Sequence, residues 1–152
     1  MLEIGKVPND ILEKLLLRYA SIKRSEVLSE PKVGEDCAVL DFKDQLCIIT
    51  TDPITGADDE IGTLAVTVSC NDIASAGAEP VGLLVTLLIP AQTPLSQLED
   101  VMAQIERKAR ELNVAIVGGH TEVTDAVNRT VLSITAVGRV KPSELVTTAG
   151  AK

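Results

Sequence analysis

Residues 71–90 read NDIASAGAEPVGLLVTLLIP and contain the end of a helix, a stop signal and a complete strand. The helix is expected to begin at the acidic residues 58–60, which favour the positive end of its dipole. It is expected to run to Ala76, and Gly77 ends it. Residues 81–89 are apolar except for Thr86, as in an apolar strand, and Pro90 closes it. The stretch therefore predicts a helix followed directly by an apolar strand.

Other periodic segments surround this stretch. One helix is expected over residues 8–19 with Asn9 as its cap, and another begins at Thr93-Pro94, with Thr93 as the cap. A turn at Lys43-Asp44 joins two of the expected strands. The strands outside the opening stretch are expected at residues 37–42, 45–51, 114–117 and 130–140. This order of elements predicts an α+β protein, or an α/β mixed sheet flanked by helices.

The composition limits the class of protein. The chain has 152 residues, of which 45% are hydrophobic and 24% charged, as expected of one globular domain over residues 1–152. Only Tyr19 and Phe42 are aromatic, and the formal net charge is −8. A nucleic-acid partner is therefore not expected, because such partners need stacking platforms or clustered cations.

The cysteines and the apolar runs indicate a cytoplasmic protein. Cys37, Cys47 and Cys70 form no CxxC pair, and we expect each to be a buried, reduced thiol. The longest apolar run is too short to span a bilayer, so no membrane partner is expected.

Acidic residues are concentrated between Gly34 and Glu60. Eight acids lie there against one base, Lys43, and this leaves a segment charge of −7. A solvated acidic rim is the ordinary explanation of such a run. Asp52 is different, because it is expected at the end of a strand, where the ligands of α/β proteins commonly bind.

Asp72 lies on what is expected to be an apolar stripe of the second helix. A lone carboxylate in such a place is costly unless it is paired, hydrogen-bonded or bound to a metal. Mg²⁺ is a suitable partner, since it binds one or two carboxylates together with water and phosphate oxygens. A hydrogen bond from the helix to a loop is the alternative.

A glycine pair at Gly118-Gly119 follows an expected strand, and two glycines allow a backbone to approach a ligand closely. A simple turn would explain them equally well. His120 comes next and is a metal ligand, an acid–base group or an ordinary loop residue. Walker, GxGxxG and GxSxG motifs are all absent from the sequence. The residues alone therefore predict an acid-rich, metal-linked site, and they predict nothing more specific.

Five short motifs follow one another along the chain. They are GEDCAV at 34–39, TTD at 50–52, NDIASAGAEP at 71–80, VGGHTE at 117–122 and AVG at 136–138. Together they resemble the N-terminal domain of the PurM-like superfamily, which includes aminoimidazole ribonucleotide (AIR) synthase, the hydrogenase-maturation protein HypE, thiamine-monophosphate kinase and selenophosphate synthetase. The resemblance runs from about residue 5 to 140, and GGHTEV is most similar to HypE-like and AIR synthase-related members.

The resemblance implies a Mg²⁺-ATP site. Its metal ligands would be Asp36, Asp52 and Asp72, with Glu122 or His120 as a further ligand. Its nucleotide contacts would be Asn71, Gly118, Gly119 and Thr121. Relatives have an acid at the position of His120, and Glu122 is favoured here because Mg²⁺ prefers oxygen ligands. No residue is assigned a catalytic role.

The resemblance also implies an activity and partners. Relatives form dimers by joining two sheets into a barrel, and they activate an oxygen of a small molecule, such as a carbonyl or carbamoyl group, by phosphoryl transfer from ATP. Their second, C-terminal domain is absent from these 152 residues, so little turnover is expected from this chain alone. A noncatalytic dimerising scaffold or ligand-binding module with the same fold is the alternative.

Overall fold

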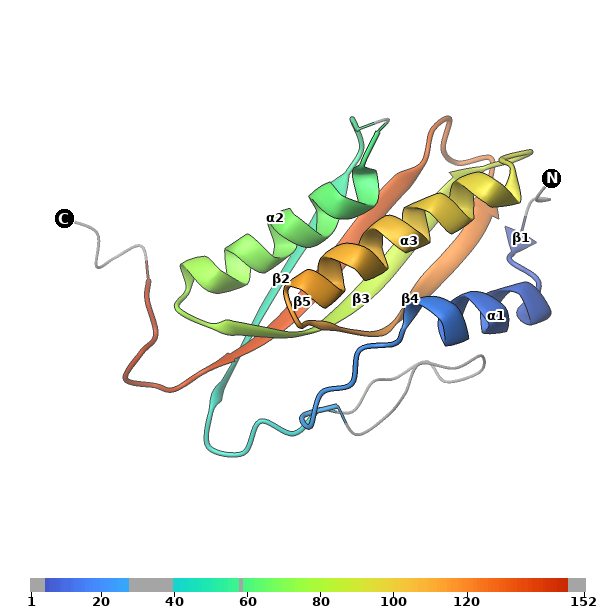
Figure 1. Ribbon diagram of the computed structural model, residues 1–152. Helices are drawn as coiled ribbons and strands as arrows, with labels where there is room; N and C mark the ends of the chain where they lie inside the picture. The colour runs from blue at the N-terminus through green and yellow to red at the C-terminus, as the bar shows by residue number, and fades with distance from the viewer. Residues whose placement is uncertain (1–4, 28–39, 58, 148–152) are drawn as a thin grey trace.

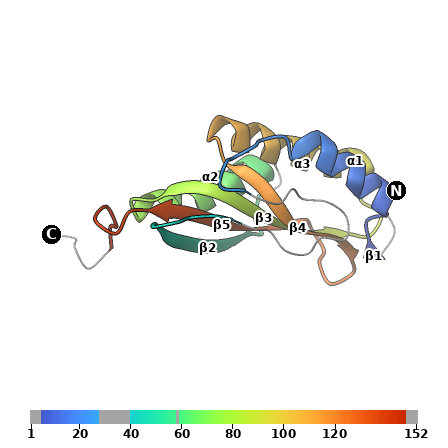
Figure 2. The same cartoon turned by 90° about the horizontal axis from the view of Figure 1, so that it is seen from below.

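The fold is a five-stranded mixed sheet with helices on one face. The computed structural model describes residues 5–27, 40–57 and 59–147, and the strand order is β1-β4-β3-β5-β2. Figure 1 shows the elements, and Figure 2 shows α1, α2 and α3 on the same side of the sheet. The elements are β1 (Gly5–Lys6), α1 (Asn9–Tyr19), β2 (Leu46–Ile54), α2 (Ile61–Ser75), β3 (Glu79–Pro90), α3 (Leu95–Glu111), β4 (Ala115–Thr124) and β5 (Val131–Val140). The predicted fold class is confirmed.

The two central strands form a crossover unit. β3 and β4 are parallel and are connected through α3, as parallel neighbours require. α3 faces the sheet with the apolar stripe that its helical period predicts. The stripe residues that are buried are Leu98, Val101, Met102, Ile105 and Ala109. The strand expected at 81–89 lies at the centre of the sheet, and alternate residues from Leu83 to Ile89 are buried against the helices.

The strand expected at 37–42 is not found among the described residues. Leu40 forms only an isolated antiparallel bridge to Val27, and residues 41 and 42 are not in a strand. β2 pairs instead with β5, antiparallel, over its whole length. A local pattern predicts that a segment is extended, but it does not identify the partner strand.

Two of the predicted helix caps are wrong. Asn9 is already inside α1, and Pro8 before it makes no side-chain cap. Pro94, not Thr93, occupies the cap position of α3, and the Thr93 hydroxyl donates a hydrogen bond to the Pro90 carbonyl at 2.7 Å. A proline with its fixed φ stands at each of these positions and makes no side-chain hydrogen bond to the first turn.

The cysteines differ in burial. Cys70 is buried in α2, as predicted, but Cys47 is exposed on β2, because β2 is at the edge of the sheet. Cys37 lies outside the described residues. None of the helices in the described part of the chain is both long and apolar enough to cross a bilayer.

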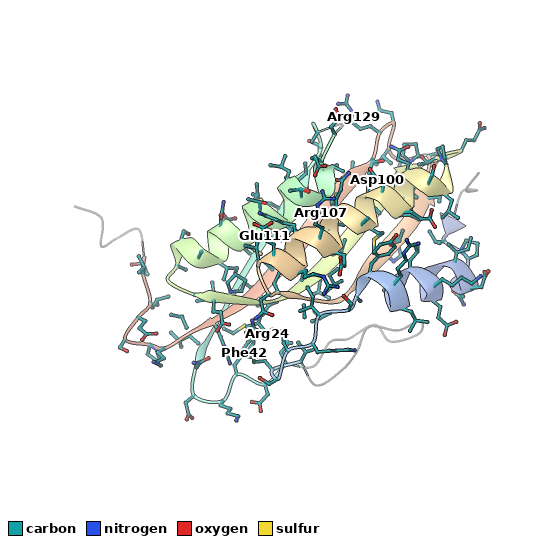
Figure 3. All side chains as sticks on the ribbon, viewed as in Figure 1. Arg24, Phe42, Asp100, Arg107, Glu111 and Arg129 are labelled. Carbon is teal, nitrogen blue, oxygen red and sulfur yellow. The ribbon has the colours of Figure 1, made fainter. Side chains whose placement is uncertain are left out.

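Four charged side chains meet where the loop after α1 reaches the sheet. This four-charge cluster consists of Arg24, Glu26, Glu79 and Arg139. Arg24 pairs with Glu79 at 2.6 Å and with Glu26 at 3.2 Å, while Arg139 pairs with Glu26 at 2.5 Å and with Glu79 at 3.1 Å. The Arg24 and Glu26 side chains are only 7% and 6% exposed. Figure 3 shows Arg24 at the end of the sheet where β3 begins and β5 ends, and Arg129 at the opposite end of the molecule.

The cluster predicts a pH dependence of stability. Burial would raise the pKa of Glu26, but the hydrogen bond from Arg24 and the charges of Arg24 and Arg139 lower it from 4.5 to about 2. A depressed carboxyl pKa stabilises the fold above the unfolded value, and this stabilisation is lost as the pH falls from 4.5 toward 2. Between about pH 6 and pH 3 we expect the wild type to lose about 2 kcal/mol more than Glu26→Gln. Urea unfolding at both pH values measures this difference, and parallel losses would show that the cluster does not depress this pKa.

Candidate functional site

Two carboxyl groups that are 20 positions apart in sequence lie side by side between β2 and α2. We call Asp52 and Asp72 the acid pair. The adjoining Asp72 carboxyl raises the pKa of Asp52 above its ordinary value, first through hydrogen-bonding contact and also through its negative charge. The Thr50 hydroxyl donates a hydrogen bond to Asp72 Oδ2 at 3.1 Å.

The alternation of β2 explains why Thr50 and Asp52 both face the helix. They pair in register with Ala136 and Ile134 of β5, which are fully buried on the helix side of the sheet. Residues two apart in a strand point to the same face. Thr50 was not among the predicted site residues, and its position two residues before Asp52 was the signal that could have identified it.

Close packing of α2 on β5 positions Asp72. Its neighbour Ile73 is fully buried and occupies the space beside Gly138, where an added Cβ would lie 2.3 Å from Ile73 Cγ2. The Ser69 hydroxyl also donates to the Ile134 carbonyl at 3.4 Å. With Ile73 pointing into the core, the preceding residue faces the edge strand and solvent.

The surroundings of both acids differ from the prediction. Asp52 is not at a strand end, because β2 continues through Pro53 to Ile54. A proline is tolerated there since β2 pairs only with β5 among the described strands. The expected apolar stripe of α2 is partly open, with Leu64 and Asp72 both exposed. The acid pair therefore lies at an open edge, and the partners of Asp72 belong to a strand rather than to a loop.

The glycine pair lies inside a strand, not in a loop after one. Residues 118–122 all belong to β4. Gly119 has φ 147°, and a Cβ there would lie 1.9 Å from the Val85 carbonyl oxygen. The glycine is thus required for the approach of β4 to β3.

His120 and Glu122 lie on the face of the sheet away from the helices. His120 is in register with Thr86, whereas its neighbour Gly119 is in register with Val85, which is buried under the helices. His120 Nε2 is 3.3 Å from Glu122 Oε2, and both side chains are nearly half exposed. Within one chain they are separated from the acid pair by the sheet itself and by β3 and β5.

The remaining predicted site residues are distributed as follows. Asn71 is exposed beside Asp72, and Thr121 is half-buried in β4. Asp36 lies outside the described residues. Among the residues that the structure does describe, no three His, Cys, Asp or Glu side chains are grouped so that they could hold a metal. Of the predicted metal ligands, Asp52 and Asp72 therefore lie together, whereas His120 and Glu122 are paired with each other on the other face of the sheet.

Three cavities in the described part of the structure lie away from the acid pair. One of about 660 Å³ is between residues 41–45 and 139–143, close to the four-charge cluster. One of about 240 Å³ is near the start of α2, and one of about 650 Å³ borders the β4–β5 loop. Neither Asp52 nor Asp72 lines any of these three cavities.

Together these features define a mixed-sheet α/β domain with paired carboxyls between its edge strand and a covering helix. Comparison with known proteins assigns this class to a family. Residues 34–140 match the N-terminal domain of AIR synthase related proteins, and the chain belongs to this family. The predicted membership of the PurM-like superfamily is confirmed.

Individual relatives agree with this assignment. The chain is 30% identical over 141 residues to a protein described as a hydrogenase expression/formation protein of Methanocaldococcus jannaschii, covering 90% of the chain and 42% of the relative. It is 36% identical over 139 residues to the phosphoribosylformylglycinamidine cyclo-ligase of Pyrococcus horikoshii, covering 82% of the chain and 40% of the relative. The chain thus spans about two fifths of the length of these curated relatives.

A solved structure gives the same result for the fold. The hydrogenase-maturation protein HypE in complex with ATP superimposes with a TM-score of 0.76 at 27% identity, and the match covers 91% of this chain and 41% of HypE.

Proposed function

We propose that this chain is the Mg²⁺-ATP-binding domain of an AIR synthase-related, HypE-like enzyme. The complete enzyme activates a carbonyl, carbamoyl or phosphate-acceptor oxygen of a small molecule by phosphoryl transfer. The observation that carries the proposal is the acid pair, in which the carboxyls of Asp52 and Asp72 adjoin at an open edge and Thr50 donates a hydrogen bond to Asp72. The similarity to HypE solved with ATP supports the choice of nucleotide.

Two adjacent carboxyls repel each other when both are ionised, and this repulsion contributes to the raised pKa of Asp52. A divalent cation bound between the two carboxylates would relieve the repulsion. Such a cation also lets a polyphosphate approach a chain whose net charge is −8. Phosphoryl transfer depends mainly on this kind of positioning and charge neutralisation.

The other predicted ligands have defined places in the proposal. Asp72 and Asp52 would hold Mg²⁺, and Asp36 would join them. Asn71, beside Asp72 on the exposed side of α2, would contact the nucleotide, and Gly118, Gly119 and Thr121 of β4 would do so from a second copy. His120 and Glu122 of the same chain are too far around the sheet to bind the same ion, so they would contribute only from a second copy.

The proposal includes the predicted homodimer. β2 leaves one edge unpaired among the described strands, and Ile49 on it is 64% exposed, as expected of a strand that meets a partner. Joining two sheets into a barrel would use this edge. Cytoplasmic location and low turnover by this chain alone stay predictions.

Calorimetric titration of Mg²⁺-ATP into the chain tests the proposal. We expect metal-dependent binding by the wild type and a loss of at least about tenfold in affinity for Asp52→Asn, since even outer-shell changes at metal sites cost this much. Asp125→Asn, an exposed acid on the β4–β5 loop, is the matched control and should bind like the wild type. Equal affinities for the wild type and Asp52→Asn, or no Mg²⁺-dependent heat from the wild type, would favour the noncatalytic scaffold instead.

A further inference from the structure

We infer that this chain has a second small-molecule site, which takes an uncharged planar heterocycle with a hydrogen-bond donor and an acceptor side by side, as nucleobases have. The site is the cavity of about 660 Å³ between residues 41–45 and 139–143, which we call the Phe42 cavity. Its two recognition residues are Phe42 and Gln45. The inference does not rest on the proposed function, since it concerns other residues and needs no metal.

A hydrogen-bonded turn before β2 holds the two recognition residues. The Lys43 N–H donates to Asp41 Oδ1 at 3.1 Å, and the Gln45 N–H donates to the Phe42 carbonyl at 3.1 Å. Phe42 and Gln45 are therefore the two ends of one turn, and both line the Phe42 cavity. Figure 3 shows Phe42 at the same end of the molecule as Arg24.

Gln45 supplies an unused hydrogen-bonding group. In the described part of the chain, its Oε1 is the one buried side-chain oxygen or nitrogen that has no hydrogen-bond partner. Buried polar atoms are nearly always partnered, so an exception needs an explanation. A carboxamide presents an acceptor and a donor side by side, and it pairs with the edge of adenine through two hydrogen bonds. A ligand with such an edge would therefore satisfy Gln45.

Phe42 supplies an aromatic ring. The chain has only two aromatic residues, and the other one, Tyr19, is buried in the core. Phe42 is only partly buried, and it lines the Phe42 cavity. A planar heterocycle suits this position, because every nucleobase has a π-face that can stack on an aromatic side chain.

The size and the charge of the cavity limit the ligand further. Its volume lies within the range of about 300–1,000 Å³ that is usual for small-molecule sites. The lining has three acids and three bases and hence no net formal charge. The Glu26 carboxylate, which belongs to this lining, already accepts hydrogen bonds from Arg24 and Ser25 and is paired with Arg139. A ligand with a phosphate would meet no excess of positive charge, so an uncharged ligand is favoured.

The Phe42 cavity is separate from the acid pair. Leu46, which follows Gln45, is the first residue of β2 and comes six residues before Asp52. At about 3.3 Å per residue this is a distance of roughly 20 Å along the strand. A ligand in the Phe42 cavity therefore leaves the carboxyls of Asp52 and Asp72 uncovered.

Calorimetric titration of adenosine into the 152-residue chain, with EDTA in place of Mg²⁺, tests the inference. We expect saturable binding with a dissociation constant below about 1 mM. Purine riboside has no exocyclic amino group and so offers no donor to Gln45 Oε1. It should bind at least about fivefold more weakly than adenosine.

Four variants assign the binding to the Phe42 cavity. Gln45→Leu and Phe42→Leu should each weaken adenosine binding at least about fivefold. Phe42→Tyr keeps the ring and should bind within about twofold of the wild type. Gln97→Leu, the matched control, makes the same change as Gln45→Leu in the cavity near the start of α2 and should bind like the wild type. Gln45→Leu removes an unpartnered buried atom and so should not lower the unfolding temperature.

The outcomes separate this inference from the proposed function. Equal adenosine affinities for the wild type, Gln45→Leu and Phe42→Leu, or no saturable binding below about 1 mM, would overturn the inference. Neither result affects the proposed function, which depends on Mg²⁺ and Asp52. Competition between adenosine and Mg²⁺-ATP that Gln45→Leu abolishes would also overturn the inference, because the Phe42 cavity would then belong to the ATP site. If Asp52→Asn loses Mg²⁺-ATP binding, it should still bind adenosine like the wild type.

Discussion

Gly119→Ala is expected to destabilise the protein by about 4 kcal/mol or more, which puts it among the rare severe substitutions. A Cβ at this position would lie 1.9 Å from the Val85 carbonyl oxygen and 2.7 Å from the Val85 nitrogen. The obstruction is backbone of β3, which is hydrogen-bonded on both sides and cannot move away. The φ of 147° adds strain for any residue with a side chain.

The adjacent glycine provides the matched control for this prediction. A Cβ at Gly118 would lie 3.2 Å from Leu84 Cδ2, the end of a flexible side chain, so Gly118→Ala should cost no more than about 1.5 kcal/mol. Urea unfolding followed by circular dichroism compares the two variants with the wild type. Similar losses of unfolding free energy for both would contradict the assigned approach of β4 to β3.

Asp72→Asn is expected to have effects of opposite sign on stability and on binding. Without metal, the amide removes one of two adjacent negative charges, can still accept the hydrogen bond from Thr50 and can donate one to Asp52. The free protein should therefore unfold at a higher temperature. With Mg²⁺-ATP, loss of a direct ligand should lower the affinity at least about a hundredfold.

Such opposite effects are typical of groups kept for function at the expense of stability. Thermal unfolding with and without Mg²⁺-ATP measures both effects in one experiment. The nucleotide should raise the unfolding temperature of the wild type and of Asp125→Asn, and leave that of Asp72→Asn unchanged. A lower unfolding temperature for nucleotide-free Asp72→Asn would show that the acid pair is held together for structural reasons.

Local patterns were sufficient for much of the fold. The helix that ends near residue 76 and the strand that follows it were predicted correctly, since helical period, a stop at Gly77 and a largely apolar run are all local signals. The observed φ of 74° at Gly77 is the left-handed conformation that such a stop requires. The predicted end of β4 was wrong because a glycine pair looks like a turn, whereas close strand packing requires it here.

The site is formed by contacts between distant residues, and local sequence patterns do not predict such contacts. Asp52 and Asp72 meet only because β2 pairs with β5 and α2 packs over both, and motif resemblance, not spacing, predicted their association. His120 was expected near them, but its phase in β4 places it on the other face of the sheet. The four-charge cluster was not predicted at all, because Arg24 and Arg139 come from opposite ends of the sequence.

The position of a bound divalent ion tests the central claim most directly. Crystals grown with Mn²⁺ and ATP would locate the ion by its anomalous scattering. The account predicts a peak within about 2.5 Å of carboxylate oxygens of both Asp52 and Asp72, next to the phosphates. A peak at His120 and Glu122 with none at the acid pair, or nucleotide bound with no ion at Asp52 and Asp72, would contradict it.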